Sequence, residues 1–193
     1  KDIKVQVRDY VRRTKQMEKR KAYFALIDTS LSRKLRGDLR IFITAGAFNQ
    51  VWWLQECERP FLEELSTHLT REAFATSERI PNYDEQGEWR MCIIAAGTAS
   101  RAGGILTVGA WWGDIILSSR ALRDSREAKA LGYCEVISLP RSGLEATMAS
   151  YPQAADLVRQ AGLRLATSRA MIIIGAYARQ WEARHGGNAG TVT

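Results

Sequence analysis

Apolar residues in the first 44 positions recur at helical spacing within a strongly charged background. Ile3, Val7 and Val11 share one face, and no Gly or Pro interrupts the run before Gly37. The pattern predicts helices over residues 2–44. Their apolar stripes are too narrow to form a core, so we expect these helices to pack on something else, with a neighbouring subunit as the natural candidate.

A second helix within this region is expected to begin after residues 28–30, Asp-Thr-Ser, which form a helix start signal. Its apolar stripe runs from Leu31 to Phe42 at helical spacing. Further along, apolar residues on one face predict another helix around residues 60–69.

Short apolar stretches separated by turn-rich sequence follow, and each predicts a strand. They cover residues 73–76, 89–95, 105–108 and 133–139. Helix returns at residues 141–149 and in a long run from Tyr151, and the Gly-rich tail at residues 186–193 is expected to lack fixed structure. Short strands with helices at both ends predict an α+β fold built on a small antiparallel barrel or jelly-roll.

The stretch from Ile105 to Leu139 carries the main candidate chemistry. Two strand-like segments enclose a turn, Gly109 to Gly113, and a short helical piece predicted to begin at Asp114. Backbone N–H groups and the positive end of a helix dipole at such a turn suit an anion or a sugar hydroxyl. The alternative is that Asp114 merely caps the helix.

The net charge of +7 is concentrated in one segment. Residues 1–42 hold 13 Lys or Arg against 5 Asp or Glu, so the rest of the chain is close to neutral. This basic segment is either a solvated helical face or a contact with an anionic lipid surface or an acidic protein neighbour. A basic helical nucleic-acid binder is the alternative from another class, but the segment lacks interleaved aromatics and a recognition helix, so we expect no nucleic-acid partner.

The remaining chemistry favours a protein without catalytic activity. No nucleophile and base pair, metal-ligand spacing or Walker loop is present, so we expect neither an enzyme nor a metal site. Cys57, Cys92 and Cys134 lie in apolar surroundings and are predicted to be buried free thiols in a reducing compartment. Apolar runs are too short to span a bilayer, and the first residue, Lys1, favours a fragment of a longer protein.

Residues 112–117, WGDIIL, resemble the first half of the phosphate-binding cassette of cyclic-nucleotide-binding domains. An apolar strand that ends in glycine, residues 91–97 (MCIIAAG), is similar to that family's earlier signature. The resemblance extends over nearly the whole chain. It implies a β-roll flanked by helices, with a last helix that covers the ligand pocket and reports its occupancy.

Upstream, residues 8–11 (RDYV), 26–27 (LI) and 31–39 (LSRKLRGDL) resemble the C-linker of cyclic-nucleotide-gated, hyperpolarization-activated and ether-à-go-go channels. That linker joins the last pore helix to the ligand domain, and its first helix is truncated here. The resemblance implies a helical C-linker over residues 1–52, a cyclic-nucleotide-binding homology domain over 53–185 and a flexible tail over 186–193. It also implies a tetramer that assembles through residues 2–44.

In the family an Arg and a Ser or Thr before the return strand hold the cyclic phosphate. An ungapped alignment places Ser125 at the hydroxyl position and Asp124 at the arginine position, where an aspartate would repel the ligand. If the loop shifts by one residue, Arg123 or Arg126 would substitute. The candidate pocket residues are therefore Gly113, Asp114, Ile115, Arg123, Ser125 and Arg126, and the lid candidates on the last helix are Tyr177 and Trp181.

Residues 129–136, KALGYCEV, are closest to ether-à-go-go members, which largely do not respond to cyclic nucleotides and fill the pocket with their own C-terminal segment. The resemblance thus implies the cytoplasmic regulatory module of a tetrameric voltage-gated channel, with potassium the favoured ion. We expect no cofactor beyond cAMP or cGMP as a weak ligand. A genuine cAMP- or cGMP-binding gating domain is the alternative.

Overall fold

The computed structural model describes residues 3–185, and between residues 6 and 45 some positions are described by their backbone alone. Two helices, α1 (Ile3–Ser30) and α2 (Arg33–Phe48), precede α3 (Arg59–Thr67) and the strands. The strands are β1 (Thr70–Phe74), β2 (Arg79–Ile80), β3 (Arg90–Ala96), β4 (Ala99–Arg101), β5 (Gly104–Leu106), β6 (Trp111–Trp112), β7 (Ala128–Ala130) and β8 (Cys134–Pro140). A 3-10 turn, η1 (Arg120–Leu122), lies before β7, and α4 (Arg141–Ser150) and α5 (Pro152–His185) end the described chain.

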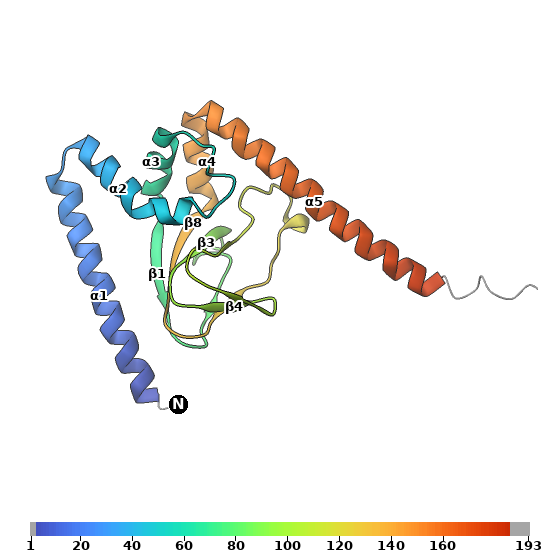
Figure 1. Ribbon diagram of the computed structural model, residues 1–193, viewed down its shortest axis with the longest axis horizontal. Helices are drawn as coiled ribbons and strands as arrows, with labels where there is room; N and C mark the ends of the chain where they lie inside the picture. The colour runs from blue at the N-terminus through green and yellow to red at the C-terminus, as the bar shows by residue number, and fades with distance from the viewer. Residues whose placement is uncertain (1–2, 186–193) are drawn as a thin grey trace, which may run out of the picture.

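The strands form two four-stranded antiparallel sheets, with orders β1-β8-β3-β6 and β2-β7-β4-β5. Figure 1 shows the strands at the centre of the molecule, α3, α4 and the start of α5 gathered at one end of the roll, and α1 beside it. The predicted α+β class and antiparallel β-roll are confirmed.

The central strands β3 and β8 are buried on both faces, because side chains alternate between the two sides of a strand. Met91 and Ile93 of β3 belong to a cluster with the helices, whereas Cys92 and Ile94 belong to a second cluster between the sheets. The partner strand β8 follows the same alternation, since Met91 pairs with Leu139. Two cores therefore share one pair of strands.

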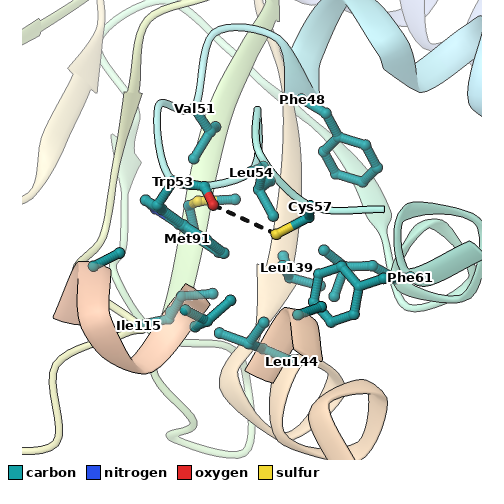
Figure 2. Packing of buried hydrophobic residues seen from close by; sticks show 14 of the residues in the cluster. Phe48, Val51, Trp53, Leu54, Cys57, Phe61, Met91, Ile115, Leu139 and Leu144 are labelled. Carbon is teal, nitrogen blue, oxygen red and sulfur yellow. Dashed lines mark hydrogen bonds between the residues drawn. The ribbon is translucent and has the colours of Figure 1, made fainter. Parts of the chain in front are cut away.

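Figure 2 shows the helix-side core, in which side chains from the turn after α2, from α3 and from α4 converge on β3 and β8. Phe61 is fully buried and meets the Tyr151 ring edge-on, with the ring centroids 5.9 Å apart. The Cys57 thiol donates to the Trp53 carbonyl at 3.5 Å. This packing fixes α3 and α4 against the sheet that carries the candidate site.

The three cysteines are free and buried, as predicted. Burial raises the pKa of Cys92 to about 12, and it raises the pKa values of Cys57 and Cys134 to about 11. These thiols are therefore protonated near neutral pH. Among the described residues no group of His, Cys, Asp and Glu has an arrangement that could hold a metal ion.

Several predicted boundaries are wrong. Residues 28–30 do not start a helix, because α1 continues through Ser30, and the start of α2 is instead capped by Ser32, whose hydroxyl accepts the Leu35 N–H at 3.4 Å. The first predicted strand lies at Thr70–Phe74, and β2, β4, β6 and β7 were not expected. The helical piece at Asp114 is only a turn, closed by the Leu117 N–H bonding the Asp114 carbonyl at 3.1 Å.

The helices α1 and α5 contact the roll over only a part of their length. The Tyr10 hydroxyl of α1 donates to the Ala73 carbonyl at 3.4 Å, and its ring meets Tyr133 at a centroid distance of 6.3 Å. Only the first turns of α5 are buried, and the helix then extends away from the roll (Figure 1). No helix among the described residues is long and apolar enough to cross a membrane. The predicted tail from residue 186 lies outside the described residues.

Candidate functional site: the cassette between β6 and β7

The segment from Gly113 to Glu127 connects β6 to β7, and we call it the cassette. It begins with a backbone conformation that requires glycine, because Gly113 has φ +96° and a Cβ there would lie 2.2 Å from the Arg90 carbonyl oxygen. Gly113 is therefore a structural requirement of the turn. Any ligand contact it makes is through its backbone.

Two apolar side chains fix the cassette to the protein interior. Ile115 and Leu117 are both fully buried, and Ile115 belongs to the helix-side core. The structure thus places Ile115, a predicted pocket residue, among core side chains. Its burial anchors the first turn of the cassette so that the neighbouring polar groups have fixed positions.

Asp114 joins the two halves of the cassette and the last helix. Its carboxylate accepts the Asp124 backbone N–H at 2.9 Å and faces the Arg169 guanidinium of α5 at 3.3 Å. The residue is only 6% exposed, so this charge lies in a poorly solvated place. The helix-capping alternative does not apply, since no helix begins at Asp114.

Asp124 faces two arginines. Arg101 of β4 approaches its Oδ2 at 3.1 Å and also donates to the backbone carbonyls of Asp124 and Arg126. Arg126 binds both carboxylate oxygens, with distances of 2.8 Å to Oδ1 and 2.6 Å to Oδ2. The side chain of Asp124 is 8% exposed, and the hydrogen bond from Arg126 holds the pKa of Asp124 well below its usual range.

These contacts make one group, which we call the carboxylate cluster: Arg101, Asp114, Asp124, Arg126 and Arg169. Each carboxylate already has an arginine partner from its own chain. The expected repulsion between Asp124 and an anion is therefore reduced, because Asp124 is neutralised in place. The same pairing occupies the guanidinium groups that an anionic ligand would need.

Arg123 and Ser125, the other predicted phosphate contacts, do not join the carboxylate cluster. The Arg123 guanidinium donates to the Leu117 carbonyl at 2.7 and 2.9 Å and lies 5.6 Å from the centroid of the Trp89 ring. Both residues instead line a cavity of about 600 Å³. We call it the arginine cavity, and its lining is Tyr83, Gly87, Glu88, Trp89, Ser118, Arg120, Arg123, Ser125 and Arg141.

The lid candidates lie far along α5 in the part that leaves the roll. Tyr177 is 70% exposed and Trp181 is 56% exposed. In this structure neither side chain covers the cassette, so the predicted lid is not formed. A side chain of α5 that does reach the cassette is that of Arg169.

Sequence reasoning missed Arg101 and Arg169, although each has a signal. Arg101 precedes Ala102 and Gly103, which have φ values of +53° and +84° and turn β4 into β5; the Gly-Gly pair at 103–104 marks that hairpin. Arg169 follows the buried face of α5 at helical spacing, seven residues after Gly162. That helix passes close to the cassette at Gly162, where a Cβ would lie 2.9 Å from the Ile116 carbonyl.

Comparison with known proteins identifies the fold. No family model matches the chain. Among solved structures, the C-linker/CNBHD of zELK channels, crystallized in the presence of cAMP, is similar with a TM-score of 0.51 and 18% identity, over 70% of each chain. The fold is that of a channel C-linker and cyclic-nucleotide-binding homology domain.

Relatives in sequence agree with this assignment. The cyclic nucleotide-gated channel alpha-4 proteins of Mus musculus and Rattus norvegicus are each 22% identical over 144 residues, which cover 68% of this chain. The match spans a quarter of each relative's length. The resemblance predicted from residues 91–97 and 112–117 to a cyclic-nucleotide-binding domain of such channels is thus confirmed.

Proposed function

We propose that this chain is the cytoplasmic regulatory module of a tetrameric voltage-gated channel and that it binds cyclic nucleotides weakly or not at all. The module couples the state of the homology domain to the pore through α1 and α2. Potassium is the proposed ion, on the resemblance of residues 129–136 to ether-à-go-go channels. The observation that carries the weak-binding proposal is the internal pairing of the carboxylate cluster.

A cyclic phosphate needs a positively charged partner, but the two arginines beside Asp124, Arg101 and Arg126, are already paired with the Asp124 carboxylate. Recruiting Arg101 would separate it from a buried carboxylate and leave Arg126, whose side chain is exposed, as the remaining charged partner of Asp124, which is unfavourable. A ribose hydroxyl would compete for Asp114 with Arg169 and with the Asp124 N–H. Both expected ligand contacts therefore require the loss of an existing one.

The binding test is isothermal titration calorimetry of the chain with cAMP and with cGMP. We expect dissociation constants of roughly 100 μM or weaker, which corresponds to about −5.5 kcal/mol or less favourable. A dissociation constant near or below about 1 μM would instead favour the alternative, a genuine cAMP- or cGMP-binding gating domain.

The tetramer proposal draws on exposed apolar side chains of α2. Phe42 is 82% exposed and Leu35 is more than half exposed, so this stripe lacks a partner within the described part of the chain. We expect concentration-dependent self-association in sedimentation velocity and its loss in Phe42→Asp. Identical sedimentation of both proteins would contradict assembly through this face.

Salt-dependent binding to DNA in a gel shift would instead favour the nucleic-acid alternative.

A further inference from the structure

The arginine cavity gathers positive charge that the protein balances only in part. Arg120, Arg123 and Arg141 all line it, and Glu88 is the single acidic residue in the lining. Glu88 is occupied, since its carboxylate accepts the backbone N–H and the hydroxyl of Ser142 at the start of α4. The lining therefore carries a formal surplus of two positive charges, and Glu145, outside the lining, offsets one of them by pairing with Arg141.

Two of the arginines are held in place by backbone carbonyls. Arg123 and Arg141 both donate to the Leu117 carbonyl, at 2.7 and 2.5 Å, so two like-charged groups meet at one neutral acceptor. Burial, followed by the neighbouring charges of Arg141 and Arg120, lowers the pKa of Arg123. Two acids lie nearby: Glu145 pairs with Arg141 at 2.6 Å, and Asp114 belongs to the carboxylate cluster.

The third arginine, Arg120, differs from the other two. Arg120 is exposed at the edge of the cavity, and its side chain makes no hydrogen bond or ion pair within residues 3–185. Ser118 and Ser125, whose side chains carry hydroxyl donors, line the same space. Donors of several kinds thus surround a cavity large enough for a small molecule.

We propose that the arginine cavity binds a phosphomonoester group. A phosphomonoester carries between one and two negative charges near neutral pH, which complement the positive surplus of the lining, and its three terminal oxygens accept from several donors at once. Arginine is well suited to such a group, because its planar fork offers paired N–H donors. The site shares no residue with the carboxylate cluster, so the two can be tested separately, and two of its lining residues, Arg123 and Ser125, are predicted contacts of the cyclic phosphate.

The test is a titration of the full chain with inorganic phosphate and with O-phosphoserine at constant ionic strength, followed by the Trp89 indole N–H signal in NMR and by calorimetry. We expect saturable binding with a dissociation constant of about 1 mM or tighter. Arg120→Gln should weaken it about tenfold, because one charge-assisted contact is removed without disturbing an internal bond. Arg164→Gln, a change of the same charge outside the cavity, should leave it unchanged.

One further variant and a lipid probe locate the site and identify the source of the phosphate group. Arg126→Gln removes a positive charge from the carboxylate cluster, and it should change phosphate affinity by less than about twofold. A loss of binding in Arg126→Gln but not in Arg120→Gln would overturn the proposal, as would the absence of saturable binding to both soluble probes. Stronger binding to phosphatidylcholine vesicles that contain phosphatidic acid than to O-phosphoserine would identify a lipid headgroup as the source, provided that Arg120→Gln weakens it.

Discussion

The carboxylate cluster and the arginine cavity lie on the same short cassette, yet they handle charge in opposite ways. In the cluster two buried carboxylates are paired with arginines from β4, the cassette and α5. In the cavity three arginines converge, and the acidic residues nearby do not balance all three charges. The difference follows solvation: a buried charge must be compensated internally, whereas a half-open cavity tolerates a surplus that water screens.

This contrast shows why a cassette motif alone does not define a ligand. Residues 112–117 fit the family pattern, but the chemistry of the segment depends on Arg101 and Arg169, which come from a hairpin and a distant helix turn. Arg101 and Arg169 pair with the carboxylates of Asp124 and Asp114, so the charges of this potential anion site are neutralised within the protein. The groups that stay available to an anion lie a few residues away, on Arg120 and Arg123.

The largest expected effect comes from a substitution of Gly113. This glycine forms the turn that positions both the carboxylate cluster and the arginine cavity. Gly113→Ala would place a Cβ 2.2 Å from a backbone oxygen at φ +96°, so the turn after β6 must move. We expect a loss of at least about 3 kcal/mol in the free energy of unfolding, measured by urea denaturation. Both phosphate binding and the cassette hydrogen bonds should be lost with it.

Gly103→Ala is the matched control for this change. Gly103 has φ +84°, but no atom lies within 4 Å of the added Cβ. Its substitution should therefore cost only the conformational strain, about 1 to 2 kcal/mol. Equal losses in the two variants would show that the close approach to Arg90 has no energetic weight.

The second effect concerns Asp124 and breaks the internal balance of the carboxylate cluster. Asp124→Asn removes the charge that compensates Arg101, whose side chain is largely buried. We expect about 2 to 3 kcal/mol of destabilisation in urea denaturation at neutral pH. Asp156→Asn, in an exposed pair with Arg159, should cost less than about 0.5 kcal/mol.

Acid titration sharpens this prediction. Because the folded pKa of Asp124 is depressed, its contribution to stability is present above the unfolded value of about 3.9 and is lost as pH falls toward the folded pKa. The wild-type chain should therefore lose more stability below about pH 4 than Asp124→Asn does. Parallel losses in the two proteins would mean that Asp124 has an ordinary pKa.

Long, strongly patterned elements were predictable from sequence, and short ones were not. The helices near residues 60–69 and 141–149 and the strand ending at Leu139 follow from apolar periodicity, and each lies within two residues of its observed position. By contrast, β2, β6 and β7 have two or three residues, which is too few for a period to show. Their positions depend on pairing with distant strands.

The candidate site was only partly predictable for a related reason. Gly113 and Asp114 are in the expected turn, but the predicted helix at Asp114 is absent, and Ile115 is a core residue rather than a ligand contact. Arg123 and Ser125 belong to a different cavity from Arg126. Neighbouring positions in a loop can point to different surroundings, and no spacing rule fixes which one each side chain meets.

The smallest expected effect concerns Arg169, the residue through which α5 contributes a positive charge to the carboxylate cluster. Its guanidinium lies 3.3 Å from Asp114 and its side chain is about a third exposed, so the pair is only partly buried, and without it Asp114 still accepts the Asp124 N–H. Arg169→Gln should cost less than about 1 kcal/mol of stability. Freed from this pair, Asp114 should accept a ribose hydroxyl more readily, so we expect cAMP affinity in calorimetry to rise about two- to fivefold. Arg159→Gln, on the same helix and outside the cluster, should change neither quantity. A fall in cAMP affinity with Arg169→Gln would show that this arginine binds the nucleotide and does not compete with it.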